Sequence, residues 1–214
     1  MIDNIKGAIF DLDGTLVDSL WVWASIDDDY LGKYGFSVPD NFNEEINHLS
    51  FTQTAHYIKE KFNIPDSIDK MLNDWQTMAL NHYSHNVKLK SGALDFLKLL
   101  KSKSIKISLA TSNSVELLTP CLKNNGIFEY FDAITTTDEV KRSKEAPDVY
   151  LLAAEKIGIP PSECLVFEDI LPAAMGAKSA GMKVCIVKDK YCITPKEELL
   201  KYADKYIDSY LDLL

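Results

Sequence analysis

From about residue 91 onward, short apolar segments with the character of β-strands alternate with amphipathic helical segments. Apolar residues recur at helical spacing in segments such as 93–101 and 147–156. Strands that alternate with helices pair in parallel, and the helices then cover both faces of the sheet. We therefore predict an α/β fold with a Rossmann-like parallel sheet. The expected strands are residues 7–10, 105–110, 133–137, 164–167 and 183–187, followed by a C-terminal helix and an edge strand.

The chain that follows the first expected strand has the pattern of an all-helical insert. No convincing strand interrupts residues 16–83, where apolar residues recur at helical spacing. We expect a helical cap domain at residues 16–85 and an α/β core domain at residues 1–15 and 86–214. Because the insert leaves from the end of the first strand, it would sit as a lid over the carboxyl edge of the sheet.

Two of the expected helices carry local signals at their ends. Residues 16–34 have a helical pattern, and Gly35 lies just past that segment. Another helix is expected over residues 115–124, where Pro120 should kink or shorten it because proline has no backbone N–H to donate.

The composition limits the partners and the compartment that we expect. The chain has 214 residues, 46% of them hydrophobic, and its net charge of −9 argues against nucleic acid or an anionic membrane as the main partner. No apolar run approaches the roughly 20 residues that cross a bilayer, and the first residues lack the pattern of a signal peptide. The four cysteines, Cys121, Cys164, Cys185 and Cys192, show no metal-ligand spacing, so we expect reduced thiols in the cytoplasm. We expect a monomer, because no long apolar seam calls for a partner.

Polar residues follow four of the expected strands, at the edge where open parallel sheets bind their ligands. These groups are Asp11 with Asp13, Thr111-Ser112-Asn113, the loop that holds Lys144, and Glu168-Asp169. Four carboxylates gathered at one edge would repel one another strongly, and a purely structural role does not explain them. A hard divalent cation with oxygen ligands, together with the lysine, resolves this repulsion. The sequence therefore predicts a Mg²⁺ site.

The segment Asp11-Leu12-Asp13-Gly14-Thr15 supplies two carboxylates two residues apart, directly after an apolar strand. Gly14 permits a turn that would bring both side chains to the same side. One carboxylate can then act as a nucleophile while the other moves a proton. The alternative use of such a segment is an ordinary Asx-type turn.

These groups of residues resemble the motifs of the haloacid dehalogenase superfamily. Residues 10–19 (Phe-Asp-Leu-Asp-Gly-Thr-Leu-Val-Asp-Ser) are similar to its first motif, and Thr111-Ser112-Asn113 is similar to its second. Lys144 in Lys-Glu-Ala-Pro-Asp resembles the third motif, and Phe167-Glu168-Asp169 resembles the fourth. The motifs occur in family order over nearly the whole chain. Residues 177–182 and the helical insert resemble the beta-phosphoglucomutase-like branch, whose cap is helical.

The resemblance implies a role for each matching residue. Asp11 would be the nucleophile and a metal ligand, and Asp13 would move the proton and bind the metal through its backbone carbonyl. Lys144 would offset the charge on Asp11 and on the phosphate. Asp169 would coordinate Mg²⁺, with Glu168 in the outer coordination shell. The phosphoryl oxygens would be bound by Thr111 and Ser112, with Asn113 nearby.

The identity of residue 13 separates branches of the superfamily, and an aspartate there favours hydrolysis or mutase chemistry. Phosphosugar mutases of this branch hold a second phosphate with a basic residue in a cap motif, and the comparable stretch of residues 48–52 contains no arginine or lysine. We therefore expect a phosphatase that hydrolyses a small phosphate monoester, such as a sugar phosphate, through an aspartyl-phosphate on Asp11. A mutase of the beta-phosphoglucomutase type is the alternative, and an inactive binding module is a minor one.

The chain departs from the family pattern after its fourth motif. The branch usually has serine and then glycine after the Glu-Asp pair, whereas Ile170, Leu171 and Pro172 follow here. The conformation of this loop is therefore not implied by the resemblance, although the ligand Asp169 is intact.

Overall fold

The structure is a computed structural model that describes residues 4–46, 49 and 51–214. Contacts within the chain divide it into two compact units. The larger unit consists of residues 1–19 and 87–214, and the smaller unit consists of residues 20–86.

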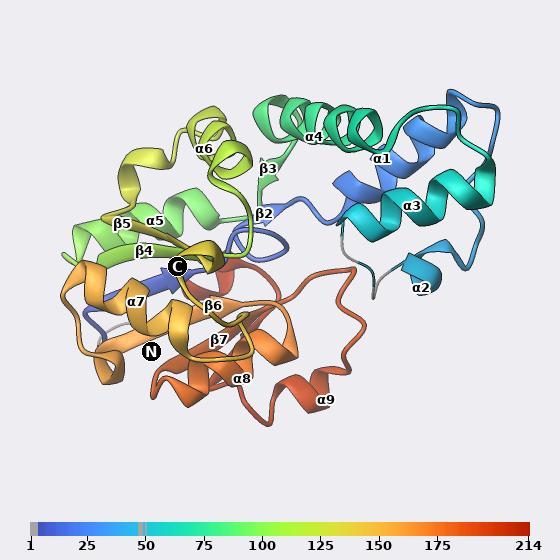
Figure 1. The fold of residues 1–214 in the computed structure, drawn as a ribbon. Coiled ribbons are helices and arrows are strands. Elements are labelled where there is room, and N and C mark those ends of the chain that lie inside the picture. The colour runs from blue at the N-terminus through green and yellow to red at the C-terminus, as the bar shows by residue number, and fades with distance from the viewer. Residues whose placement is uncertain (1–3, 47–48, 50) are drawn as a thin grey trace. The chain divides into compact units, whose positions relative to one another are not determined.

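A six-stranded parallel sheet forms the centre of the larger unit (Figure 1). Its spatial order is β5-β4-β1-β6-β7-β8, and every neighbouring pair is parallel. Phe10 lies in register with Leu109 and Phe167, so the central strands end side by side. The predicted α/β fold with a parallel sheet is confirmed. The strands are β1 (Gly7–Phe10), β4 (Lys106–Thr111), β5 (Ala133–Thr136), β6 (Cys164–Glu168), β7 (Lys183–Val187) and β8 (Lys205–Ile207).

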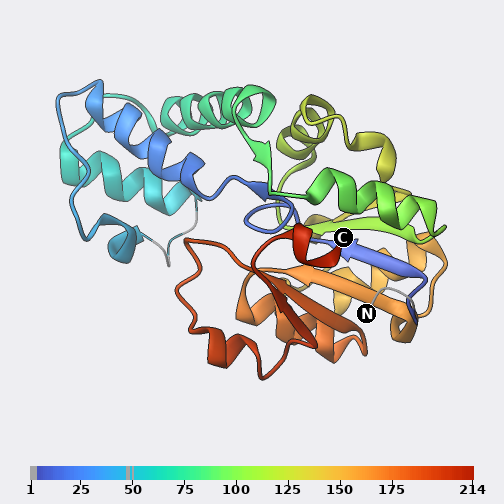
Figure 2. The same ribbon diagram turned by 180° about the vertical axis from the view of Figure 1, so that it is seen from behind.

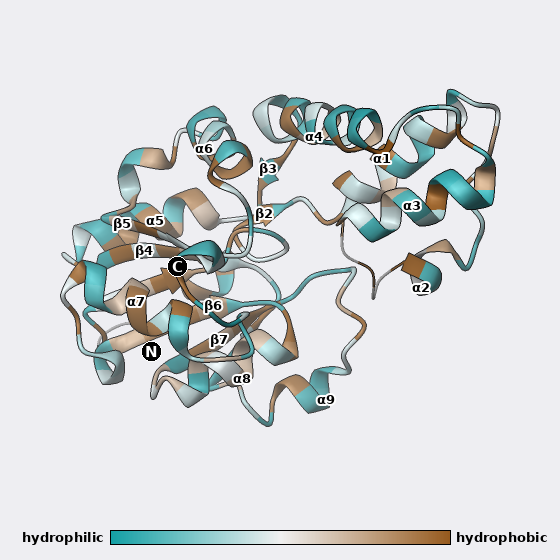
Figure 3. Ribbon diagram, viewed as in Figure 1, coloured by the Kyte–Doolittle hydropathy of each residue, from teal (hydrophilic) through white to brown (hydrophobic). Residues whose placement is uncertain are grey.

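Helices cover both faces of this sheet, and successive residues of β1 reach opposite layers because side chains alternate along a strand. Ile9 belongs to a buried cluster with residues of α7 (Asp148–Ile157) and α8 (Leu171–Ser179). Phe10 stacks on Phe167 with 4.5 Å between ring centroids, next to Phe96 of α5 (Ala93–Ser102). Figures 1 and 2 show the unit from opposite sides, and Figure 3 shows that its strands are largely hydrophobic.

One further α-helix of ten residues and several short elements complete the larger unit. They are α6 (Val115–Asn124), η2 (Phe128–Tyr130), η3 (Thr137–Glu139), η4 (Pro161–Glu163), α9 (Lys196–Leu199) and η5 (Tyr210–Leu213). Of the two effects expected of Pro120, shortening is wrong, because α6 spans the whole expected range, and a kink stays a prediction. Proline leaves the carbonyl of Glu116 without its helical partner, and Glu116 is exposed, so water can take that place.

A two-stranded antiparallel sheet forms where the chain leaves and re-enters the larger unit. Val17 and Asp18 (β2) pair with Lys88 and Leu89 (β3). The expected helix over residues 16–34 is therefore wrong in its first residues, since α1 spans Trp21–Gly32. The physical reason is local: the backbone N–H of Val17 donates to the carbonyl of Leu12, which closes a turn and leaves residue 17 extended.

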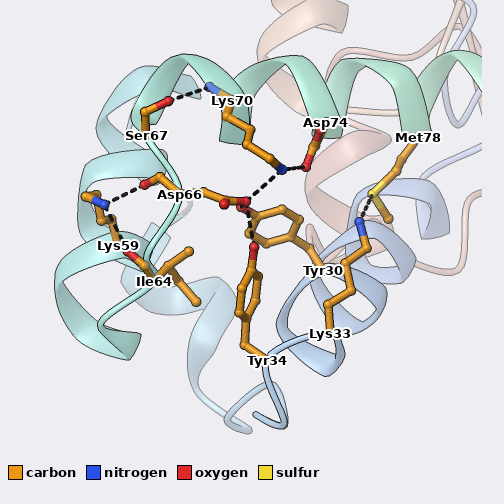
Figure 4. A network of polar contacts seen from close by, with 10 residues as sticks. All are labelled: Tyr30, Lys33, Tyr34, Lys59, Ile64, Asp66, Ser67, Lys70, Asp74 and Met78. Atoms are coloured by element: carbon orange, nitrogen blue, oxygen red, sulfur yellow. Dashed lines mark hydrogen bonds and ion pairs between the residues drawn. The ribbon is translucent and has the colours of Figure 1, made fainter.

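The unit of residues 20–86 is all helical in its described part. Its helices are α1, α2 (Phe42–Ile46), α3 (Phe51–Phe62) and α4 (Ile68–His85). A polar network centred on Asp66 ties the loop before α4 to α1 (Figure 4). Asp66 accepts hydrogen bonds from the hydroxyls of Tyr30 and Tyr34, and Lys70 forms an ion pair with it. Among the described residues of the whole chain, no helix combines the length and apolar character needed to span a bilayer.

Candidate active site

The loop after β1 carries the first two acidic residues of the site. The backbone N–H of Asp11 donates to the carbonyl of Phe167 at 3.0 Å, which extends the pairing of β1 with β6 to the site itself. Gly14 has a φ of 77°, a conformation that favours glycine, and its N–H donates to the carbonyl of Val17. This turn leaves Asp11 at the carboxyl edge of the sheet with only 7% of its surface exposed.

Lys144 joins Asp11 to the end of β6. Its ammonium nitrogen lies 2.5 Å from Oδ1 of Asp11 and 2.5 Å from Oε1 of Glu168. Burial lowers the pKa of Lys144, but the charges of Asp11 and Glu168 outweigh burial and raise the pKa above its ordinary value. The lysine therefore stays protonated at neutral pH and acts as a fixed positive charge.

Tyr150 and Thr15 complete the contacts of the two acidic residues at the end of β6. The hydroxyl of Tyr150, on α7, donates to Oε1 of Glu168 at 2.8 Å, and that of Thr15 donates to Oδ1 of Asp169 at 2.9 Å. Burial raises the pKa of Asp169 to about 7, and the neighbouring charge of Glu168 adds to this effect. Burial also raises the pKa of Asp11. Asp11 and Asp169 thus sit where their charged forms are disfavoured.

These buried groups carry an excess of negative charge. Asp11, Glu168 and Asp169 each offer a carboxylate oxygen, and the three oxygens lie within 4.8 Å of one another. One ammonium group, that of Lys144, contacts this set. Oε2 of Glu168 is buried and has no hydrogen-bond partner among the described residues. Buried carboxylates with an unpaired oxygen are the donor set that a hard divalent cation requires, so the residues fit Mg²⁺.

Asp13, two residues after Asp11, makes contacts that differ from those of Asp11. Its Oδ1 accepts a hydrogen bond from the hydroxyl of Ser19 at 2.6 Å, and its Oδ2 accepts one from the side-chain amide of Asn113 at 2.8 Å. The hydroxyl oxygen of Thr111 accepts the backbone N–H of Asn113 at 3.0 Å. Residues 111–113, which resemble the second family motif, are thereby connected to Asp13 of the first motif. Thr111 is buried, whereas Ser112 is exposed.

The structure brings most of the residues singled out in the sequence into contact, in two groups. Asp11 contacts Lys144, which contacts Glu168, and Asp13 contacts Asn113. Sequence analysis assigned no role to Thr15, Ser19 or Tyr150. Thr15 and Ser19 fall inside the first motif, so their place in it was the available signal. Tyr150 had no signal, because its contact depends on how α7 packs on the sheet, over β4, β5 and β1.

Comparison with known proteins identifies the family of this site and fold. Residues 8–187 match the sequence profile of the family described as haloacid dehalogenase-like hydrolase. The chain belongs to this family. The family resemblance and the expected enzyme are therefore confirmed, and relatives of this hydrolase are named as phosphatases.

Three similar proteins illustrate the relationship. The hydrolase is 31% identical over 192 residues to the Bacillus subtilis protein named "Putative phosphatase YhcW", which covers 87% of this chain and 84% of that one. It is 28% identical over 179 residues to the "Phosphorylated carbohydrates phosphatase" of Thermotoga maritima, covering 84% and 83% of the two chains. A crystal structure described as "putative beta-phosphoglucomutase from Thermotoga maritima" has a TM-score of 0.85 and 26% identity, and covers 95% of this chain and 94% of that one.

Proposed function

We propose that this hydrolase is a Mg²⁺-dependent phosphatase that hydrolyses a small phosphate monoester through an aspartyl-phosphate on Asp11. The observation that carries the proposal is the contact of Lys144 with Asp11 and Glu168 inside a buried, carboxylate-rich set. A nucleophilic carboxylate held against a permanent positive charge suits phosphoryl transfer, because positioning and charge neutralisation supply most of its catalysis.

Asp11 and Asp169 are the side chains that we propose as metal ligands, together with the backbone carbonyl of Asp13 and with Glu168 in the outer coordination shell. When bound, Mg²⁺ would offset the charge of the carboxylates and of the substrate phosphate. The support within this chain is the excess of buried carboxylate described above and the unpaired oxygen of Glu168.

In the first proposed step, a carboxylate oxygen of Asp11 attacks phosphorus and the bond from phosphorus to the alcohol oxygen breaks. Asp13, in its protonated form, gives its proton to that leaving oxygen. Lys144 stays charged and offsets the negative charge shared by Asp11 and the phosphoryl group. The products are the free alcohol and an acyl phosphate, in which a carboxylate oxygen of Asp11 is bonded to the phosphorus.

In the second proposed step, Asp13 takes a proton from a water molecule, and the water oxygen attacks phosphorus. The bond between phosphorus and Asp11 breaks, which releases inorganic phosphate and restores the carboxylate. Asp13 is well held for the base role, since both of its oxygens accept hydrogen bonds from neutral donors. Proton delivery in the first step requires one of these bonds to be released.

The phosphoryl oxygens of the substrate are the ligands that we propose for Thr111 and Ser112. Asn113 lies one residue further along and holds Asp13 through its side-chain amide. This contact supports a role for Asn113 in orienting the proton carrier, in addition to its place near the phosphate.

We propose residues 1–15 and 86–214 as the catalytic core domain and residues 16–85 as a cap that selects the substrate. A lid suits a small phosphorylated metabolite, because closure has to exclude water from the reacting phosphorus. A phosphorylated carbohydrate is the class that the relative from Thermotoga maritima supports. A cytoplasmic monomer remains our prediction.

Phosphosugar mutase action is the second candidate, and the similarity to the structure described as a beta-phosphoglucomutase favours it. Residues 48 and 50 of the cap stretch on which this choice depended lie outside the described residues. Two assays distinguish these activities. Mutase action is measured as conversion of glucose 1-phosphate to glucose 6-phosphate, with and without a bisphosphate activator, and hydrolysis is measured as release of inorganic phosphate. Activator-dependent isomerisation faster than phosphate release would establish the mutase.

The proposal is tested by hydrolysis of an aryl phosphate such as p-nitrophenyl phosphate. We expect turnover with Mg²⁺, loss of turnover with a chelator, and loss by at least about 10³-fold in Asp11→Asn, which keeps the shape of the side chain but not its charge. Gly32→Ala is the matched control, because a Cβ atom there meets nothing within 4 Å. Turnover that is unaffected in Asp11→Asn would contradict the assignment of the nucleophile.

A further inference from the structure

A glycine lies inside helix α8, where glycine is the least suitable residue apart from proline. Gly176 is the sixth of nine residues in α8 and is buried. Glycine weakens a helix interior relative to alanine, because it loses more backbone freedom on folding. The neighbouring positions of the helix, Ala173, Ala174 and Ala177, are small and buried but are not glycine. The position therefore requires a reason of its own.

The reason is a close approach between α8 and the loop that carries Lys144. A Cβ atom at position 176 would lie 2.0 Å from the backbone oxygen of Lys144, 2.9 Å from the backbone oxygen of Ala146 and 3.1 Å from the carbonyl carbon of Glu145. All three atoms belong to the backbone, so a rotation of a side chain cannot relieve the contact. Even the smallest side chain requires the loop or the helix to move.

We propose that Gly176 is a positioning residue for Lys144. The missing side chain lets the backbone of residues 144–146 lie directly against α8. This contact fixes the point from which the lysine side chain extends to Asp11 and Glu168. The inference rests on the proposed function, since it concerns the lysine that we assign to phosphoryl transfer.

The size of the expected effect follows from the distances. Cβ atoms are essentially never found closer than 3.0 Å to another heavy atom, so a Cβ at 2.0 Å from the oxygen of Lys144 demands a shift of at least about 1 Å. The ammonium nitrogen lies at 2.5 Å from both of its carboxylate partners and has no slack in that direction. A misplacement of about 1 Å can reduce turnover by about 10²-fold. We expect Gly176→Ala to lower kcat by about 10- to 10²-fold, because the long lysine side chain absorbs part of the shift.

A double-mutant cycle between positions 176 and 144 tests this inference. The four proteins are wild type, Gly176→Ala, Lys144→Met and the double variant, each assayed for kcat on p-nitrophenyl phosphate and for the urea midpoint of unfolding. If Gly176 acts through Lys144, removal of the lysine should reduce kcat far less in the alanine background than in wild type. The shift that Lys144→Met causes in the urea midpoint should likewise be smaller in the Gly176→Ala background than in wild type, by about half or more.

Two other glycines provide controls of known geometry. Gly32 has open space around its Cβ position, so Gly32→Ala introduces the residue without a clash. Gly7 does not have this space, because a Cβ there would lie 2.9 Å from Sγ of Cys164 and 3.1 Å from Cδ1 of Ile157. Gly7→Ala therefore imposes a clash in the core away from Lys144. Neither control should be coupled to Lys144→Met in the urea midpoint.

The outcomes separate this inference from the proposed function. Additive effects of Gly176→Ala and Lys144→Met on both kcat and the urea midpoint would overturn the inference and give the glycine a packing role only. If wild type shows no turnover, the proposed function fails, and the coupling in the urea midpoint still tests the inference. If Gly176→Ala does not fold, the cycle is repeated with Glu145→Gly as the parent, because the exposed residue 145 then lets the loop yield to the new Cβ.

Discussion

Replacement of Tyr150 by phenylalanine removes one hydroxyl from the buried network behind the active site. This hydroxyl donates to Oε1 of Glu168 at 2.8 Å, and the ring of Tyr150 is fully buried. Phenylalanine keeps the ring, so the change is confined to the hydrogen bond. A hydrogen bond to a charged group contributes about 1.5–3 kcal/mol to the free energy of unfolding. Lys144 still contacts Oε1 after the change, but Oε2 has no hydrogen-bond partner among the described residues, so the loss should lie within this range.

The two units of the chain allow this loss to be located. All three tryptophans, Trp21, Trp23 and Trp75, lie in the unit of residues 20–86, so their fluorescence follows that unit, whereas far-ultraviolet circular dichroism follows both units. In urea, Tyr150→Phe should shift the transition seen by circular dichroism to lower concentration and leave the fluorescence transition nearly unchanged.

The matched control for this prediction is Tyr57→Phe. The Tyr57 hydroxyl also donates to a carboxylate, that of Glu45, but this pair is partly exposed and belongs to the unit of residues 20–86. Its loss should be smaller and should appear in the fluorescence transition. Equal losses of unfolding free energy in the two variants would refute the reasoning, since burial of the Glu168 carboxylate would then have no effect on the strength of its hydrogen bond.

Three further predictions concern acid stability, thiol reactivity and the proposed intermediate. Burial raises the pKa of Asp132, but the backbone N–H of Ile107 and the ammonium groups of Lys101 and Lys106 outweigh it and lower the pKa to about 2. The carboxylate therefore contributes stability above its unfolded pKa of 3.8 that is lost as the pH falls toward 2, and Asp132→Asn should flatten the fall of unfolding free energy between pH 4 and 2. Burial raises the pKa of Cys121 and Cys185 to about 12, so a disulfide reagent at pH 8 should modify these thiols only after unfolding, which mass spectrometry can check. Asp13→Asn should slow hydrolysis of the aspartyl-phosphate more than its formation, so rapid-quench experiments with labelled substrate should detect phosphoenzyme, and its absence would contradict the assigned proton carrier.

The sequence predicted the edge of the sheet at which the acidic residues meet because parallel strands end together. Asp11 follows β1, and Glu168 ends β6, the strand beside it. Their proximity needed only the strand assignments and the rule that ligands bind at the carboxyl edge. Lys144 was predicted from its motif, since no strand ends at that residue and its contact with Asp11 depends on a loop.

Other features could not be predicted because they depend on how distant segments pack. The hydroxyl of Tyr150 reaches Glu168 only when α7 packs on the sheet over β4, β5 and β1. The need for glycine at position 176 arises only when the loop of residues 144–146 lies on α8. The start of α1 was misplaced for a different reason, since a local turn closed on the carbonyl of Leu12 competes with the helix over residues 16–18. Helical periodicity alone does not detect that competition.

The excess of buried carboxylate makes the proposed nucleophile a source of instability when no cation is bound. Burial raises the pKa of Asp11, and at neutral pH its ionised form therefore lowers the free energy of unfolding. Asp11→Asn removes this charge, while Lys144 keeps its contact with Glu168 and is not left unpaired. In the presence of a chelator, we expect Asp11→Asn to be more stable than wild type toward urea.

Addition of Mg²⁺ should reverse this order. A ligand at about 100 times its dissociation constant raises the free energy of unfolding by about 2.7 kcal/mol when it binds the folded state alone. Wild type should gain stability of this order as Mg²⁺ is titrated, whereas Asp11→Asn, which lacks one proposed ligand, should gain much less. An equal gain in both proteins would mean that magnesium binding does not depend on the carboxylate of Asp11. A loss of stability in Asp11→Asn with chelator present would mean that the ion pair with Lys144 outweighs the repulsion among the carboxylates.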